Sequence, residues 1–118
     1  MTPNFCYFNG KIVRADKALI HPNDLGILRG YGVFDVLKTV NGKIFLFDEH
    51  FKRLNDSADY LGVKLPVEKI EIEEVIKKLI ARNKTKQASI RIVLTGGRSA
   101  DVMHFDSRTP TFYILVSE

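Results

Sequence analysis

Cysteine is almost absent from this chain, since Cys6 is the only one in 118 residues. A single cysteine excludes an internal disulfide and any zinc site that is built on several cysteines. Because proteins of reducing compartments do without disulfides, we expect the chain to be cytoplasmic.

Long apolar runs and blocks of one charge are also missing. No stretch approaches the roughly 20 apolar residues of a transmembrane helix, and the start, MTPNFCYFNG, lacks the basic and apolar regions of a secretory signal. The net charge of +4 comes from 18 basic and 14 acidic residues without a basic block. We therefore expect neither a membrane nor nucleic acid among the partners.

Self-contained catalytic motifs are absent as well. Gly30–Gly32 lacks the third glycine of a dinucleotide-binding loop and leads into a strand rather than a helix. His21, His50 and His104 are scattered without the spacing of metal ligands, so we interpret each as a surface histidine. These patterns predict neither a catalytic residue nor a metal site.

Two Asn-Gly pairs, at residues 9–10 and 41–42, indicate β-hairpins. Both central residues of a type I′ turn need a positive φ, which asparagine and glycine tolerate best. The predicted strands are 5–8 with 11–14, and 33–40 with 43–47. Neither face of the segment 33–40 is purely polar, which predicts a strand that is covered on both sides.

Two helices follow the second hairpin. Asp48 is the expected N-cap of the first, Phe51, Leu54, Ala58 and Leu61 form its apolar stripe, and Gly62 ends it. The second has its apolar stripe in residues 72–80. Strands are predicted at 89–95 and 110–117, with a polar loop at 98–109 and a loop with one short turn at 15–28.

This order of elements predicts an α+β fold, a two-layer arrangement in which a mostly antiparallel sheet of about six strands packs against two helices. We take residues 1–118 as a single domain. The last strand stops at Glu118 without a closing turn or polar tail, so we expect a domain boundary there. A short complete protein whose C-terminal strand is tied into the sheet is the alternative.

Several charged residues have both a structural and a functional interpretation. Arg53, near the start of a helix, is either a solvated arginine or an anion-binding group. Arg91 lies between two isoleucines on a strand and must be paired or face a pocket. Asp35 and Lys38 interrupt a strand and either pair with each other or line a cleft.

Three segments together resemble a known family: YFNGKIV, GVFDVLKTVNGKIFLFDEHFKRL and IRIVLTGG. They are similar to the N-terminal domain of class IV aminotransferases. These fold-type-IV pyridoxal-phosphate enzymes include branched-chain aminotransferases, D-amino-acid aminotransferases and aminodeoxychorismate lyases. The resemblance covers nearly the whole chain, and its most specific part is the spacing from GVFDV to EHFKRL.

The resemblance implies roles for individual residues. Arg53 matches the arginine that holds the cofactor phosphate, and Phe34 matches an aromatic position that lines the substrate pocket. Lys38 falls where several relatives keep a basic residue, and Arg91 matches an arginine of branched-chain-type members.

The loop after Gly97 resembles the family only in part. D-amino-acid-type members use an arginine and a histidine of this loop for the substrate carboxylate. Asp101 and Met103 occupy those places here, with Arg98 and His104 offset in register. The resemblance thus implies Arg98 and His104 as substrate-binding residues, but not D-amino-acid specificity.

The resemblance also implies a cofactor, partners and a missing part. Pyridoxal 5′-phosphate would be the cofactor of the full-length parent, an amino acid and a 2-oxo acid its substrates, and a homodimer its assembly. The lysine that forms the Schiff base lies in a second domain, which would follow Glu118. None of the 11 lysines here has that context, so we expect the chain alone to be inactive.

Three functional hypotheses stay open at this stage. The chain is the N-terminal domain of an aminotransferase, branched-chain-like in its substrates. Alternatively, it belongs to an aminodeoxychorismate lyase, which uses the same cofactor for β-elimination. Finally, it is a stand-alone, non-catalytic domain that binds a phosphorylated ligand or a partner chain.

Overall fold

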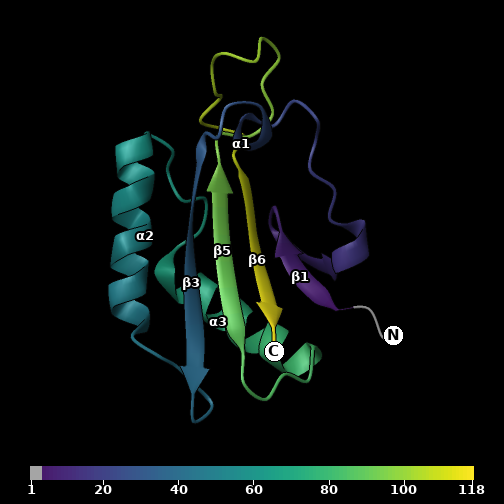
Figure 1. Cartoon of the computed structure of the whole chain (residues 1–118), viewed down its shortest axis with the longest axis vertical. Coiled ribbons are helices and arrows are strands. Elements are labelled where there is room, and N and C mark those ends of the chain that lie inside the picture. Colours follow the sequence, from purple (N-terminus) through teal and green to yellow (C-terminus); the bar gives the residue numbers. More distant parts are fainter. Residues whose placement is uncertain (1–3) are drawn as a thin grey trace.

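Six strands form one antiparallel sheet in the order β2-β1-β6-β5-β3-β4 (Figure 1). The structure is a computed structural model, and it describes residues 4–118. The strands are β1 (Phe5–Phe8), β2 (Lys11–Arg14), β3 (Gly32–Val40), β4 (Lys43–Ile44), β5 (Ser89–Thr95) and β6 (Thr111–Ser117). The helices are α1 (Leu25–Leu28), α2 (Phe47–Leu61) and α3 (Lys69–Arg82), with a 3-10 turn, η1, at Ala15–Lys17.

The two long helices cover one face of the sheet. In Figure 1, α3 lies behind the sheet and α2 runs alongside β3. The core between the layers consists of aliphatic and aromatic side chains that alternate along the strands and repeat at helical spacing. Its most deeply buried members include Leu37, Leu54, Ile72, Ile76, Leu79, Ile90, Ile92, Leu94, Phe112 and Ile114. The predicted two-layer α+β architecture is confirmed.

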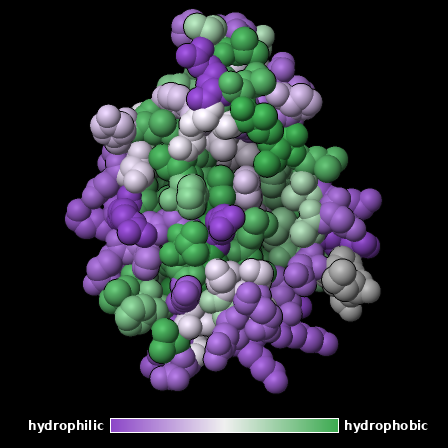
Figure 2. Space-filling view, in the orientation of Figure 1, coloured by the Kyte–Doolittle hydropathy of each residue, from purple (hydrophilic) through white to green (hydrophobic). Residues whose placement is uncertain are grey.

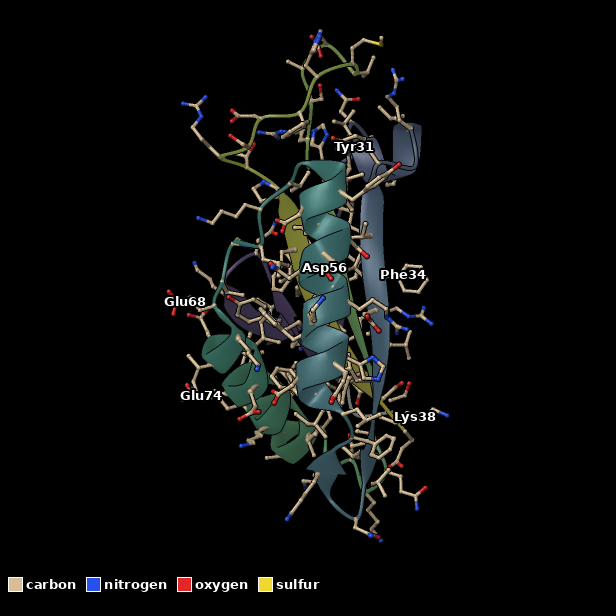
Figure 3. The ribbon with its side chains drawn as sticks, turned by 90° about the vertical axis from the view of Figure 1, so that its left-hand side faces the viewer. Tyr31, Phe34, Lys38, Asp56, Glu68 and Glu74 are labelled. Carbon is tan, nitrogen blue, oxygen red and sulfur yellow. The ribbon has the colours of Figure 1, made fainter. Side chains whose placement is uncertain are left out.

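The opposite face of β3 is open, which contradicts the prediction of a strand covered on both sides. Asp35 and Leu37 point toward the helices and are buried, whereas Phe34 is 64% exposed and Lys38 is also exposed. Figure 3 shows Phe34 and Lys38 pointing away from the helices. We call this side of the sheet the open face. Figure 2 shows apolar side chains gathered along its centre, with hydrophilic ones among and around them.

Both predicted Asn-Gly turns are present. Asn9 and Gly10 have φ values of 47° and 98°, and Asn41 and Gly42 have 52° and 78°. Positive φ at both central positions is the backbone of a type I′ turn. The local sequence therefore sets the register of both hairpins.

The start of α2 differs from the prediction. The strand expected at 43–47 shortens to Lys43–Ile44, and the helix begins at Phe47 after Leu46, whose φ is 53°. This left-handed residue turns the chain directly into the helix, so the cap predicted at Asp48 is wrong. Asp48 lies in the first turn, and its Oδ1 is 2.7 Å from Nζ of Lys69. The predicted end of α2 at Gly62 is confirmed by its φ of 83°.

The segment 15–28 contains more structure than the single turn that we expected, because both η1 and α1 form there. Asp24 is 1% exposed and caps α1 by accepting from the backbone N of Gly26 at 2.8 Å. It also accepts from the hydroxyls of Thr95 and Thr111, at 2.7 and 2.5 Å. One buried carboxylate thereby holds α1 against the ends of β5 and β6. The loop predicted at 98–109 is confirmed.

None of the helices in residues 4–118 is long and apolar enough to cross a membrane.

Candidate functional site

Arg53 and Asp35 form a two-pronged ion pair between α2 and β3. Nε of Arg53 donates to Oδ2 of Asp35 at 2.9 Å, and Nη2 donates to Oδ1 at 2.6 Å. Such parallel bonds fix both the position and the plane of the guanidinium. Arg53 is therefore neither a freely solvated arginine nor fully sequestered, because its side chain remains 66% exposed.

Strand alternation and helical spacing bring a third group to this pair. Asp35 shares with Leu37 the face of β3 that is turned toward the helices, and His50 precedes Arg53 on α2 by one turn. Nδ1 of His50 lies 3.0 Å from Oδ1 of Asp35 and 3.3 Å from Nη2 of Arg53. An ionised carboxylate only accepts, so we assign Nδ1 as a donor to Asp35.

The charge state of Asp35 follows from these contacts. Burial alone would raise the pKa of this carboxyl, but the hydrogen bonds from Arg53 and His50 outweigh that effect and lower it. Asp35 is consequently an anion at neutral pH, although its side chain is only 2% exposed. The same pairing raises the pKa of Arg53.

Arg53 also lines an open groove of about 560 Å³ along α2. Lys52 and Ser57 line this groove with it, so it offers two cations and a hydroxyl. The acidic side chains of Glu49 and Asp56 lie there too, and Asp56 is paired with Lys52 at 2.8 Å. Since a fixed guanidinium with exposed N–H groups suits a phosphate or carboxylate, this is the strongest candidate anion site in residues 4–118.

Phe34, Lys38 and Arg91 lie on the open face. Arg91 stands opposite Val36 in the pairing of β5 with β3, so Phe34 and Lys38 are its two diagonal neighbours. Its guanidinium lies 5.8 Å from the centre of the Phe34 ring. Arg91 thus avoids the cost of a buried central-strand charge, because it is exposed. Asp35 and Lys38 point to opposite faces, which excludes the pairing that we considered between them.

An apolar hollow of about 240 Å³ adjoins Phe34 on the open face. Ile20 and Ile27 form its wall on the α1 side, and Val93 and Tyr113 form its floor on β5 and β6. Burial and the nearby Asp24 raise the pKa of Tyr113, so its hydroxyl stays neutral at physiological pH. The hollow therefore combines mainly apolar walls with three polar residues, Asp24, Thr95 and Tyr113.

Arg98 and His104 line a different hollow, which the loop 96–110 forms with His21 and Asn23. His104 is tied to Asp101, whose Oδ2 lies 2.8 Å from Nδ1, and its side chain is 86% exposed. Asp101 accepts further hydrogen bonds from Ser99 and from two backbone N–H groups, and together these contacts lower its pKa strongly. The structure thus groups Arg98 with His104, apart from the Arg53 groove.

The sequence patterns predicted the wrong environment for His50 and the wrong partner for Asp35. His50 was interpreted as a surface histidine, but it is half-buried against Asp35. Asp35 was expected to pair with Lys38 or to line a cleft, and its partner is Arg53. The alternation of β3 places Asp35 beside Leu37, and this signal could have predicted a buried charge in need of a cation from the helix above.

Comparison with known proteins decides the family. The sequence pattern of amino-transferase class IV matches residues 32–118, which hold the ion pair, the open face of β3 and the loop. The chain belongs to the class IV aminotransferase family. This membership confirms the resemblance on which the site residues were predicted.

Individual class IV proteins are similar over most of the chain. A putative branched-chain-amino-acid aminotransferase of Methanocaldococcus jannaschii is 37% identical over 77% of this chain and 32% of its own length. A D-alanine aminotransferase of Listeria monocytogenes is 33% identical over 75% of this chain and 31% of its own. The chain spans about a third of the length of these curated relatives.

A solved structure of a larger aminotransferase shares the fold. The branched-chain amino acid aminotransferase of Escherichia coli superposes with a TM-score of 0.89 at 22% identity. The match covers 99% of this chain and 41% of that one. The α+β domain described above thus has the fold of one part of that larger protein.

Proposed function

We propose that the chain is the N-terminal domain of a pyridoxal-phosphate-dependent aminotransferase with branched-chain-like substrates. The parent transfers an amino group between an amino acid and a 2-oxo acid. The observation that carries this proposal is Arg53, whose guanidinium is fixed by Asp35 yet open to a groove. In this role Arg53 holds the phosphate of the cofactor.

The residues around Arg53 fit a phosphate group. The free edge of a fixed guanidinium matches two phosphate oxygens, and Lys52 and Ser57 supply a further charge and a hydroxyl in the same groove. When bound, pyridoxal phosphate supplies the electron sink that transamination requires. This chain's contribution is binding and orientation, because no lysine in it has the sequence context of the covalent attachment site.

The open face supplies the substrate side of the proposal. Lys38 and Arg91 present two cations on this face, which suits the carboxylate of an amino acid or 2-oxo acid. Phe34 and the adjoining apolar hollow suit an aliphatic side chain, which supports a branched-chain-like substrate.

Arg98 and His104 are proposed as secondary substrate contacts from the loop. Asp101 occupies the place of the arginine that D-amino-acid-type members use, and it is itself an anion that holds His104. A carboxylate in that position repels a substrate carboxylate, so we propose that D-amino acids are poor substrates. The relatives named above are aminotransferases, which favours transamination over the β-elimination of the lyase alternative.

We further propose that a second domain, a homodimeric assembly and a cytoplasmic location complete the parent protein. The open face, which includes the exposed Phe34, is the surface that the rest of the protein would cover. Borohydride reduction in the presence of pyridoxal phosphate is expected to label surface lysines unselectively. A stoichiometric adduct at one lysine would contradict the assignment of the covalent lysine to the second domain.

Binding of pyridoxamine 5′-phosphate tests the role of Arg53, because this compound lacks the aldehyde that would react with lysines. We expect the chain to bind it about tenfold more tightly than pyridoxamine, which has no phosphate, as monitored by phosphorus and proton NMR. Arg53→Ala is expected to abolish this preference. Equal binding of the two compounds by the wild-type chain would overturn the proposal.

A further inference from the structure

Asp35 contributes no exposed surface to the groove, yet it determines where the guanidinium of Arg53 lies. Two of the guanidinium N–H groups point at its carboxylate, on Nε and Nη2. Among the contacts of the described residues, none involves Nη1 of Arg53. The guanidinium is therefore held through Nε and Nη2, whereas Nη1 has no partner among these residues and the side chain is 66% exposed.

We propose that Asp35 is a positioning residue for cofactor binding, which orients Arg53 before the phosphate arrives. This inference rests on the proposed role of Arg53. An exposed arginine on a helix samples many rotamers, and ordering it costs affinity when a ligand binds. Because the ion pair with Asp35 has already ordered the side chain, the phosphate meets a fixed guanidinium edge.

The negative charge of Asp35, considered alone, predicts that this residue weakens phosphate binding. Asp35 is an anion next to the guanidinium that is proposed to hold the phosphate, so it weakens the local positive potential. If electrostatics dominated, removing this carboxylate would tighten phosphate binding. If orientation dominates, removing it weakens phosphate binding. The sign of the change therefore distinguishes the two effects.

Asp35→Asn is the informative substitution. An asparagine of nearly the same shape presents one acceptor and one donor, so it cannot accept from both Nε and Nη2 of Arg53. We expect pyridoxamine 5′-phosphate to bind about three- to tenfold more weakly to this variant. Pyridoxamine, which lacks the phosphate, is expected to bind as it does to the wild-type chain.

Asp56→Asn is the matched control. Asp56 lies on α2, as Figure 3 shows, lines the same groove, and pairs with Lys52 rather than with Arg53. This change also removes one negative charge near Arg53, without releasing Arg53. We expect unchanged or tighter binding of pyridoxamine 5′-phosphate, whereas Asp35→Asn is expected to weaken it.

The results of this experiment test the positioning role of Asp35 and the proposed function separately. If Asp35→Asn binds pyridoxamine 5′-phosphate as tightly as the wild-type chain or more so, the positioning role is overturned while the role of Arg53 stands. If the wild-type chain does not prefer pyridoxamine 5′-phosphate to pyridoxamine, the proposed function fails and takes this inference with it. Weaker binding confined to the phosphorylated compound supports positioning.

A measurement on the wild-type chain decides the matter if Asp35→Asn does not fold. Arg108 forms a similar two-pronged pair with Asp106, but both partners are exposed in the loop. The Nε–H of Arg53 should exchange with water more slowly than that of Arg108, because the acceptor of Arg53 is buried. Equal exchange rates in NMR would show that Arg53 is not held in place and would overturn the inference.

Discussion

Ile114 and Leu115 are neighbours on β6, but their side chains lie on opposite faces of the sheet. Ile114 is fully buried under the helices, whereas Leu115 is 38% exposed on the open face. Leu115 stands directly opposite Arg91 on β5. One step along the strand therefore separates the core from the surface that is proposed to meet the rest of the protein.

Introducing a glutamate at each of these two positions tests this assignment of faces. Ile114→Glu places a carboxylate in the core without a partner and is expected to prevent folding, at a cost of about 4 kcal/mol or more. Leu115→Glu is expected to change the free energy of unfolding by only about 0.5 kcal/mol, because the carboxylate faces solvent and Arg91. Urea denaturation measures both effects.

The same pair of variants tests the open face as a contact surface. If its apolar patch drives self-association of the chain, Leu115→Glu should lower the average mass that light scattering measures. A wild-type chain that is already a clean monomer would count against association through this face.

Asn83 tests how the end of α3 is attached to the sheet. Its side chain accepts from the backbone N of Phe5 at 2.8 Å and donates to the carbonyls of Phe5 and Val116, at 3.0 and 3.2 Å. Asn83→Ala leaves these backbone groups without their partner, so we expect a loss of about 2–3 kcal/mol in the free energy of unfolding. Lys78→Ala, on the exposed side of the same helix, should be nearly neutral. Equal effects of the two changes would refute the attachment.

Short-range signals explain which parts of the fold were predictable. The two Asn-Gly turns need only two residues of the right type, and the apolar stripes of α2 and α3 need only one helix each. The start of α2 was not predictable, because Leu46 adopts a left-handed conformation that leucine rarely favours. The next residue, Phe47, is buried in the core, and this burial depends on the assembled core rather than on the local sequence.

In the candidate site, too, local patterns predicted single residues but not their contacts. Arg53 and Asp35 each stood out as charges at conspicuous positions, but they are 18 residues apart and meet only when α2 packs on β3. Asn83 and Phe5 are 78 residues apart. Contacts at such separations follow from the packing of elements and not from local patterns, so the sequence predicted individual groups and the structure supplied their partners.

Asp24 provides a test of the contacts that fix α1. Asp24→Ala leaves the backbone N–H of Gly26 and the hydroxyls of Thr95 and Thr111 without their acceptor. We expect a loss of about 3 kcal/mol in the free energy of unfolding. Asp24→Asn should cost less, because the hydroxyl of Thr111 can turn from donor to acceptor. Thermal unfolding that ranks the two variants equally would argue against this arrangement.

The lowered pKa of Asp35 predicts how stability depends on pH. Its folded pKa lies below the ordinary value of 3.8, so between the two values the unfolded chain binds more protons than the folded one. The stabilisation from this carboxylate is therefore complete above the ordinary value and is lost as the pH falls through the folded one. Asp35→Asn cannot titrate, so its deficit in free energy of unfolding should be largest at neutral pH and shrink below pH 3.8. Urea denaturation across this range measures the difference, and a deficit that stays constant would mean that the ion pair with Arg53 does not stabilise the fold.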